Sequence, residues 1–555
     1  MPQDSSVYSY HTFILPFVWK CSKRVQSDLA HFAEIFEKNA VWEDTNIYDG
    51  LKQGQPLRVR DKEEALSFYK EYQFFFPNVR NALYGFDHLV VRNFTFMQNS
   101  IQNKAEYIIT KGSKDYILVV NAINLKIYNT GIALFILECE NRGGPENRQR
   151  NLAAVKAINE YGRRISLPFL PTQPDFYSLC ADRQTIRMGN VSFSTDYLQH
   201  ASNLHTKQEI IQKESVTYIS HFIKEILGYG NLRYHFTSDE ETSERDPSAL
   251  YIFPALDDRM FVQCFVNDPA ETHHMLNRSD TENEAYAFQT DAEVQKSLYE
   301  FIFVDLPGDC SCQTSAMREE LIESHLYSRW LDYGTIYAIC AQSFVCLSSN
   351  PPYHLIETFL TQYSRMVCIG LAQRATLAFF ERELSELTIE SLKSNGSLKN
   401  SAVTRIMGLR QRFSTYQSQL GFEDVSSQEQ AIELWDHIKD VFRIQKNMIS
   451  LSERMEGLHE ASNTNLNYTL NIFGLIITLF TVVETFGDVI AFHFDSTNDS
   501  VTSRIIGAFL SLFGVQPTVQ AAALGTGLRG MYIGIHLMLY LVIILFVMYK
   551  YRRRK

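Results

Sequence analysis

The sequence of 555 residues lacks the short motifs that mark common catalytic and phosphate-binding sites. It contains no glycine-rich phosphate loop, no Gly-x-Ser-x-Gly nucleophile turn and no His-Glu-x-x-His zinc motif. We therefore expect a protein that is not an enzyme and has no catalytic residues, no cofactor and no metal site.

Cysteine pairs at metal-binding spacing and excess positive charge are also missing. The closest cysteines, Cys310 with Cys312 and Cys340 with Cys346, match no zinc or haem spacing, so the nine cysteines are expected to be reduced thiols. His273 and His274 have no further ligand nearby and are expected on a solvated loop. The formal net charge of -11 argues against direct nucleic-acid binding, so a nucleotide partner would have to be bound at a local site.

The first thirty residues have no basic start followed by a continuous apolar run, which argues against a secretory signal. Residues 1–350 alternate strand-like runs, such as YSYHTFILPF, YILVVNAINLKIYN and LYEFIFVDL, with helix-like ones, such as VQSDLAHFAEIFEKN. This pattern predicts a cytoplasmic α+β or α/β domain that senses a ligand.

Helical periodicity dominates after Pro351 and Pro352, and predicts a long helical stalk over residues 351–460. The sequence SSQE from Ser426 to Glu429 has the form of a capping box and predicts the start of a helix that continues to about Asp488. Its apolar positions recur with a period near 3.5, which is typical of packing between helices. These positions are Leu434, Ile438, Val441, Met448, Leu451, Met455 and Leu458.

Two stretches near the C-terminus, 461–483 and 530–549, carry no charge and are long enough to cross a hydrocarbon core of about 30 Å. They predict transmembrane helices over 461–492 and 529–555, joined by an outer loop at 493–528 that has a re-entrant or interfacial piece. The basic tail at 550–555 places the C-terminus in the cytoplasm. Both termini are therefore expected on the cytoplasmic side of a multi-pass membrane protein.

Small and polar residues recur along one face of the first predicted span. In hydrocarbon such a face must line water or another helix, so it predicts either a pore or a dry helix interface. One chain with two spans cannot enclose a conduit, so the pore requires a homo-oligomer. The predicted pore-lining residues are Asn463, Asn467, Asn471, Gly474, Thr478, Thr481, Thr485 and Asp488.

The α/β region, the stalk helix, the two C-terminal spans and the basic tail together resemble the CorA superfamily of divalent-cation channels. The Gly-Met-Asn signature of those channels is absent, and Phe486-Gly487-Asp488-Val489 stands in its place. The resemblance therefore does not extend to magnesium selectivity.

The chain is more similar to one branch, the CorA-like membrane effectors associated with type III CRISPR systems. The stretches that carry this similarity are YSYHTFILPFVW (8–19), INEYGRRISLPFL (158–170), LDDRMFVQC (256–264), YSRWLDYGTIYAICAQSFVCL (327–347) and LAQRATLAF (371–379). The resemblance implies a homo-oligomer, with five subunits by analogy with CorA, in the bacterial inner membrane. It also implies a nucleotide second messenger, either an S-adenosylmethionine–AMP conjugate or a cyclic oligoadenylate.

In that family the bound messenger makes the membrane part open a pore or disrupt the membrane, which causes growth arrest or cell death. Two alternatives remain open: a constitutive divalent-cation transporter with an altered filter, and a membrane-anchored sensor without a conduit.

An adenine nucleotide needs cations for its phosphates and polar or aromatic groups for its base. Each candidate group also has a structural alternative. Arg163 and Arg164 could form a surface salt bridge, and Asp257, Asp258 and Arg259 could cap the end of a strand. The third group, which runs from Arg329 to Tyr333 and includes Trp330, could attach the domain to the stalk. The candidate ligand-binding residues are Arg163, Arg164, Asp257, Asp258, Arg259, Arg329, Asp332 and Tyr333.

Overall fold

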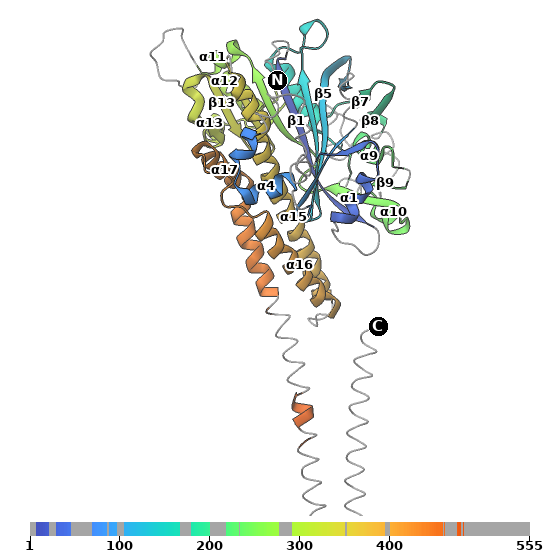
Figure 1. Ribbon diagram of the computed structural model, residues 1–555. Coiled ribbons are helices and arrows are strands. Elements are labelled where there is room, and N and C mark those ends of the chain that lie inside the picture. The colour runs from blue at the N-terminus through green and yellow to red at the C-terminus, as the bar shows by residue number, and fades with distance from the viewer. Residues whose placement is uncertain are drawn as a thin grey trace, which may run out of the picture. The chain divides into compact units, whose positions relative to one another are not determined.

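The computed structural model describes most of the chain up to residue 460 and a few later residues (Figure 1). Its strands are β1 (Ser9–Cys21), β2 (Trp42–Asp44), β3 (Val91–Phe96), β4 (Ala105–Lys111), β5 (Lys114–Tyr128), β6 (Ile132–Asn141), β7 (Arg183–Met188), β8 (Val191–Asp196), β9 (His235–Thr237), β10 (Ala249–Pro254), β11 (Phe261–Asn267), β12 (Leu326–Tyr327), β13 (Thr335–Ile339) and β14 (Ser343–Ser348). The described residues are 7–21, 29–45, 69–85, 88–96, 105–166, 179–199, 218–231, 233–276, 291–349, 352–393, 400–458, 460, 474–478 and 481.

The structure also describes helices between and after these strands. They are α1 (Leu29–Glu37), α4 (Pro77–Tyr84), η1 (Pro145–Asn147), α6 (Leu152–Arg163), α9 (His221–Gly228), α10 (Glu240–Arg245), α11 (Pro269–Met275), α12 (Ala292–Phe303), α13 (Ser315–His325), η3 (Ser328–Tyr333), α14 (Tyr353–Thr358), the π-helical turn η4 (Phe359–Tyr363), α15 (Ser364–Lys393), α16 (Asn400–Gln419) and α17 (Glu429–Phe442). Residues 69–74 and 444–458 are also helical.

The strands form one mixed sheet of 14 strands, in the order β12-β13-β14-β11-β1-β6-β5-β4-β7-β8. The sheet branches at β1, because its first half pairs with β11 and its second half with β10. Pro16 lies at this branch, where it has no N–H to donate and its carbonyl accepts from Ala255 at 2.9 Å. A second branch lies on β5, which pairs with β4 before a bulge at Val120/Ala122 and with β3 after it.

The two faces of the sheet are covered by different helices, because successive residues of a strand point to opposite faces. On one face Trp19 stacks on Phe32 of α1 with ring centroids 4.2 Å apart, and Tyr107 contacts Phe222 of α9. On the other face Phe261 contacts Phe442 of α17. Figure 1 shows α1 and α9 on one side of β1, with α4, α15 and α17 on the other.

Several predicted elements match the structure, and one does not. The strand-like runs at 8–17, 116–129 and 132–140 coincide with β1, β5 and β6. The strand predicted in LYEFIFVDL is wrong, because residues up to Phe303 belong to helix α12. The Asp291 side chain caps this helix by accepting from the Glu293 N–H, and the run of aromatic and β-branched residues at its end hid its helical period.

The chain divides into two compact units, 1–383 with 409–452 and 384–408 with 453–555. The predicted limit near residue 351 marks the change from strands to helices. Helical residues just after it nevertheless pack on the sheet within the first unit, where Thr376 of α15 shares a buried hydrogen bond with Thr130 at 3.0 Å.

The predicted fold with two transmembrane helices, and with it the multi-pass membrane localisation, is contradicted. Within the described parts of the chain no helix is both long enough and apolar enough to cross a bilayer. The helix α15 has the length, at 30 residues, but it carries charges along its course, including Arg365, Arg374 and Glu381. The predicted spans 461–492 and 529–555 and the loop 493–528 lie outside the described residues, apart from 474–478 and 481.

The predicted continuous helix from Ser427 to Asp488 is also wrong. Helix α17 ends at Phe442, the next residue Arg443 has a left-handed φ of 55°, and helical residues resume at 444. The apolar stripe continues in phase across this break, with Leu434, Ile438 and Leu451 buried, so periodicity did not reveal it. The capping box does not form either, since the Ser426 hydroxyl donates to the Phe74 carbonyl and α17 begins at Glu429.

Candidate functional site

The structure brings five of the predicted ligand-binding residues together at the end of α6. Arg164 pairs with Arg259 in an isolated antiparallel bridge. The Met260 N–H donates to the Arg163 carbonyl at 2.7 Å, and the Ile165 N–H donates to the Asp258 carbonyl at 3.2 Å. The two backbone segments therefore run side by side.

The paired arginines are satisfied inside the protein. Arg163 is 2% exposed and donates to the Glu160 carboxylate at 2.6 Å, to Gln342 Oε1 at 2.6 Å and to the Val304 carbonyl at 3.0 Å. Arg164 donates from Nε to the other oxygen of Glu160 at 2.9 Å. One buried carboxylate thus holds both guanidinium groups.

The acidic group forms a second ion pair beside the first. Arg259 donates to Asp257 Oδ2 at 2.6 and 2.9 Å, and its Nε lies 3.6 Å from Asp258 Oδ1. Burial raises the pKa of Asp258 to about 6, helped by its hydrogen bond with Asp257 and by the charge of that residue. Burial opposes ionisation of Asp257 as well, but the hydrogen bonds from Asp258 and Arg259 and the charge of Arg259 lower its pKa.

This arginine cluster, defined by Glu160, Arg163, Arg164 and Asp257–Arg259, has three cations and three carboxylates. Its formal charge is therefore zero, and Arg163 already has an acceptor at each of its three nitrogens. A phosphate would have to displace a buried internal carboxylate without gaining surplus positive charge. The arrangement favours a structural role over phosphate binding.

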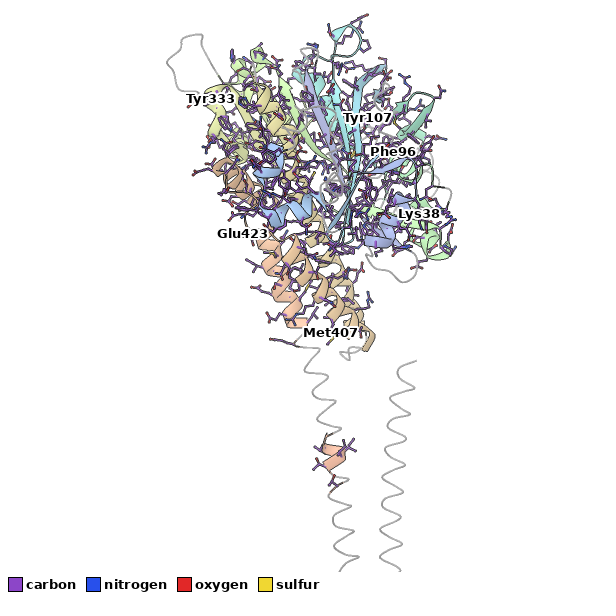
Figure 2. The ribbon with its side chains drawn as sticks, viewed as in Figure 1. Lys38, Phe96, Tyr107, Tyr333, Met407 and Glu423 are labelled. Atoms are coloured by element: carbon purple, nitrogen blue, oxygen red, sulfur yellow. The ribbon has the colours of Figure 1, made fainter. Side chains whose placement is uncertain are left out.

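The remaining predicted ligand-binding residues, Arg329, Asp332 and Tyr333, lie elsewhere, in η3. Arg329 pairs with Glu433 of α17 at 2.5 Å, and the Tyr327 hydroxyl donates to the same carboxylate at 2.6 Å. Tyr333 is 75% exposed, and Figure 2 places it at the outer surface. Among the described residues no hydrogen bond or ion pair joins η3 to the arginine cluster.

Only Gly474, Thr478 and Thr481 of the predicted pore-lining residues belong to the described part of the chain. The Thr478 hydroxyl donates to the Gly474 carbonyl at 2.8 Å, and Thr481 makes the same bond one turn back, to the Ile477 carbonyl. These hydroxyls satisfy their own helix, as threonine often does. The remaining positions, Asn463, Asn467, Asn471, Thr485 and Asp488, lie outside the described residues.

A polar cavity that sequence reasoning missed lies on the sheet face covered by α4 and α15. Its volume is about 210 Å³. The cavity brings together side chains from β3, β5, α4, α15 and residues 69–74. The polar residues that line it are Thr45, Glu71, Tyr84, Asn93, Thr95, Asn124, Lys126 and Arg365.

Lys126 is the unusual residue among those that line this cavity. It is 7% exposed, and its ammonium group donates to Asn93 Oδ1 at 2.9 Å. No carboxylate of the described residues lies within ion-pair distance of it. Burial lowers the pKa of Lys126 to about 8, and the nearby positive charge of Arg365 lowers it further, against the attraction of Glu71 and Glu138.

Among the side chains that line the cavity, positive charge exceeds negative charge, while a second carboxyl, Glu138, lies close enough to act on both cations. Two cations, Lys126 and Arg365, line it together with one carboxylate, Glu71, which leaves a formal surplus of one positive charge. Glu138 lies behind Asn124, whose amide donates to it at 2.9 Å, and burial raises the pKa of that carboxyl. Two cations that line one cavity are groups that bind phosphate or carboxylate.

Other features of the described residues are weaker candidates. A cleft of about 440 Å³ between α1 and residues 230–234 is lined by His31, Lys38 and Arg233, but Lys38 is paired with Glu34, and the amide nitrogens of Asn39 and Asn231 donate to backbone carbonyls. Within the described ranges no group of three or more His, Cys, Asp or Glu side chains could hold a metal ion.

One signal in the sequence could have pointed to the cavity. The β5 run YILVVNAINLKIYN is apolar except for asparagines and one lysine, and Asn124 and Lys126 share a face. A buried strand that keeps a lysine needs a partner for it.

Comparison of the chain with protein-family models, with curated proteins and with solved structures finds no match to any of them.

Proposed function

We propose that the protein is a sensor that binds a nucleotide messenger, with a phosphate group of the ligand in the cavity between Lys126 and Arg365. The observation that carries this proposal is the buried ammonium group of Lys126, which has an amide oxygen as partner and no carboxylate within ion-pair distance among the described residues. A buried cation is costly unless it is paired, and a perturbed pKa beside a second cation is typical of a functional site.

The size of the cavity limits which part of a ligand it can hold. At about 210 Å³ it is smaller than the roughly 300 Å³ at which pockets for whole small molecules begin. It suits a phosphate group, with the ribose and base of a nucleotide outside it. The Tyr84 hydroxyl and the amide nitrogens of Asn93 and Asn124 already donate to Glu71, the Leu83 carbonyl and Glu138, so the phosphate would be bound chiefly by the two cations.

The nucleotide class follows from the resemblance to the effectors of type III CRISPR systems. Both the S-adenosylmethionine–AMP conjugate and the cyclic oligoadenylates carry the phosphate that this cavity would bind. The proposal concerns messenger binding alone, and it includes neither a conduit nor passage of ions. That the protein is a homo-oligomer and not an enzyme also stays a prediction.

Titration calorimetry on the full chain tests this proposal, with the S-adenosylmethionine–AMP conjugate, a cyclic oligoadenylate and AMP as separate ligands. We expect one of the messengers to bind, and Lys126→Met to weaken its binding at least about tenfold, since a charge-assisted bond contributes roughly 1.5–3 kcal/mol. Lys114→Met is the matched control, because Lys114 lies at the exposed start of the same strand. Equal affinity of the wild type and Lys126→Met would refute the assignment of the cavity.

A further inference from the structure

We infer that Glu71 is an internal competitor for the ligand, and that a bound phosphate releases the helical hairpin 69–85 by taking Arg365 from it. This inference rests on the proposed function, since it assigns a regulation to the same cavity. The term hairpin here means helical residues 69–74, the turn at Phe75 and Phe76, and α4.

A single oxygen atom of Glu71 joins the two helices of the hairpin and links them to α15. Glu71 Oε1 accepts from Arg365 Nε at 3.0 Å and from the Tyr84 hydroxyl at 2.9 Å. Glu71 is 5% exposed, and it belongs to the first helix of the hairpin while Tyr84 ends the second. Arg365 is the cation that the proposed phosphate would also bind, so the carboxylate and the phosphate compete for one guanidinium.

The charges favour exchange when a phosphate enters. Glu71 offers its negative charge to Arg365 and has no ion pair with Lys126, whereas a phosphate in the cavity would lie near both cations, and the monoester probe AMP carries up to two charges. The attraction of Glu71 for Arg365 is strong enough to be the main cause that raises the pKa of this arginine. The ligand therefore binds best when Glu71 has withdrawn, and such differential affinity is what shifts a conformational equilibrium.

The far end of the hairpin contacts the segment that leads into α17. The Phe76 N–H donates to the Val425 carbonyl at 3.0 Å, and the buried Ser426 hydroxyl donates to the Phe74 carbonyl. The Ser426 hydroxyl also accepts from the Gln428 N–H at 3.3 Å, just before α17 begins. A hairpin that loosens at Glu71 would thus also loosen residues 423–428.

Hydrogen–deuterium exchange on the full chain, with AMP as the phosphate probe, tests this inference. Without ligand, Glu71→Gln should raise amide exchange in both 69–85 and 423–428, because a neutral amide holds Arg365 weakly. The same variant should bind AMP about five- to tenfold more tightly, since the binding-competent state becomes more populated. In the wild type, AMP should produce the same pattern of increased exchange.

Two further variants keep the test decisive. Tyr84→Phe removes one bond to Glu71 and leaves the ion pair with Arg365, so we expect a smaller increase in the same segments. Glu106→Gln removes a carboxylate from an exposed ion pair with Arg187 and should change neither segment. If Glu71→Gln unfolds the protein, Tyr84→Phe with AMP still decides the result.

The outcomes separate the inference from the proposed function. If AMP binds at Lys126 without changing exchange in 69–85, the inference is overturned and the binding site stands. If exchange rises in 69–85 alone, transmission to 423–428 is overturned. If AMP and both messengers fail to bind any variant, the proposed function fails. The inference that a phosphate takes Arg365 from Glu71 then fails with it.

Discussion

At the residue scale, the described charges differ in whether a carboxylate balances them. Glu160 balances Arg163 within a buried network, and Arg259 is balanced by Asp257. Lys126 instead has Asn93 as its hydrogen-bond partner. This difference separates the arginine cluster, where charge supports the fold, from the cavity, where charge remains for a ligand.

The buried carboxylate of Glu160 should be important for stability. Replacing it by Gln leaves Arg163 and Arg164 buried without their counter-ion, and we expect a loss of about 3–5 kcal/mol in the free energy of unfolding. Urea denaturation followed by circular dichroism measures this loss. The control, Glu106→Gln in an exposed pair, should cost less than about 1 kcal/mol; equal losses would contradict the burial argument.

Asp258 should make stability depend on pH. Its pKa of about 6 lies above the ordinary 3.8, so the folded state favours the protonated form, and the ionised form costs stability increasingly as the pH rises through 6. Asp258→Asn should therefore stabilise the protein at pH 7.5 by about 1 kcal/mol, a value reduced for the partial exposure of the side chain. Thermal melts should show no gain at pH 4, and an equal gain at both pH values would refute this explanation.

Lys126 should make ligand affinity fall at alkaline pH. Its ammonium group loses its proton near pH 8 in the free protein, where Arg365, Glu71 and Glu138 face it and Cys368 lies nearby. A phosphate binds the protonated form, so we expect AMP affinity to decrease as the pH rises above about 8. Calorimetry at several pH values measures this, and a decrease that persists in Lys126→Met would assign it to another group.

At the element scale, close packing of helices on the sheet decides more than helix periodicity does. Helix α15 approaches α17 at Gly370, where an added Cβ would lie 2.7 Å from Ile438 Cγ2. The left-handed turn at Arg443 then ends α17. The helices after residue 352 are therefore positioned by contacts of particular residues, and not by one continuous coiled-coil stripe.

Gly370→Ala should destabilise this contact. Overpacking costs about 1–3 kcal/mol, and the better helix propensity of alanine offsets up to about 1 kcal/mol of it. The control is Gly408→Ala in α16, where nothing lies within 4 Å of the added methyl group, and there we expect a gain of up to about 1 kcal/mol. Urea denaturation distinguishes the two, and stabilisation by both substitutions would contradict the packing geometry.

At the scale of the whole molecule, the fold buries nearly every cysteine that the sequence contains. Of the nine cysteines, eight are free and buried in the described parts of the chain. Burial raises the pKa of Cys139, Cys264 and Cys346, so these thiols stay protonated as well as inaccessible. Thiol reactivity should therefore report on unfolding.

We expect a thiol reagent such as Ellman's reagent to modify at most one cysteine per native chain, and all nine after denaturation. The reaction should follow the urea unfolding curve, because each buried thiol becomes accessible only when the structure around it opens. Rapid modification of several thiols in the native protein would show that the sheet opens locally.

The sequence by itself determined the strands with clear alternation, such as β1, β5 and β6, and the change to helices near residue 351, because periodicity is a local property. It also placed Arg163 and Asp258 among candidate residues, since charges beside strand ends are visible in the chain. Tertiary structure alone decided that these charges neutralise each other. It also decided that Glu71, Lys126 and Arg365, which are far apart in sequence, line one cavity. Charge balance and cavity formation depend on which segments meet across the sheet, and no local pattern specifies that.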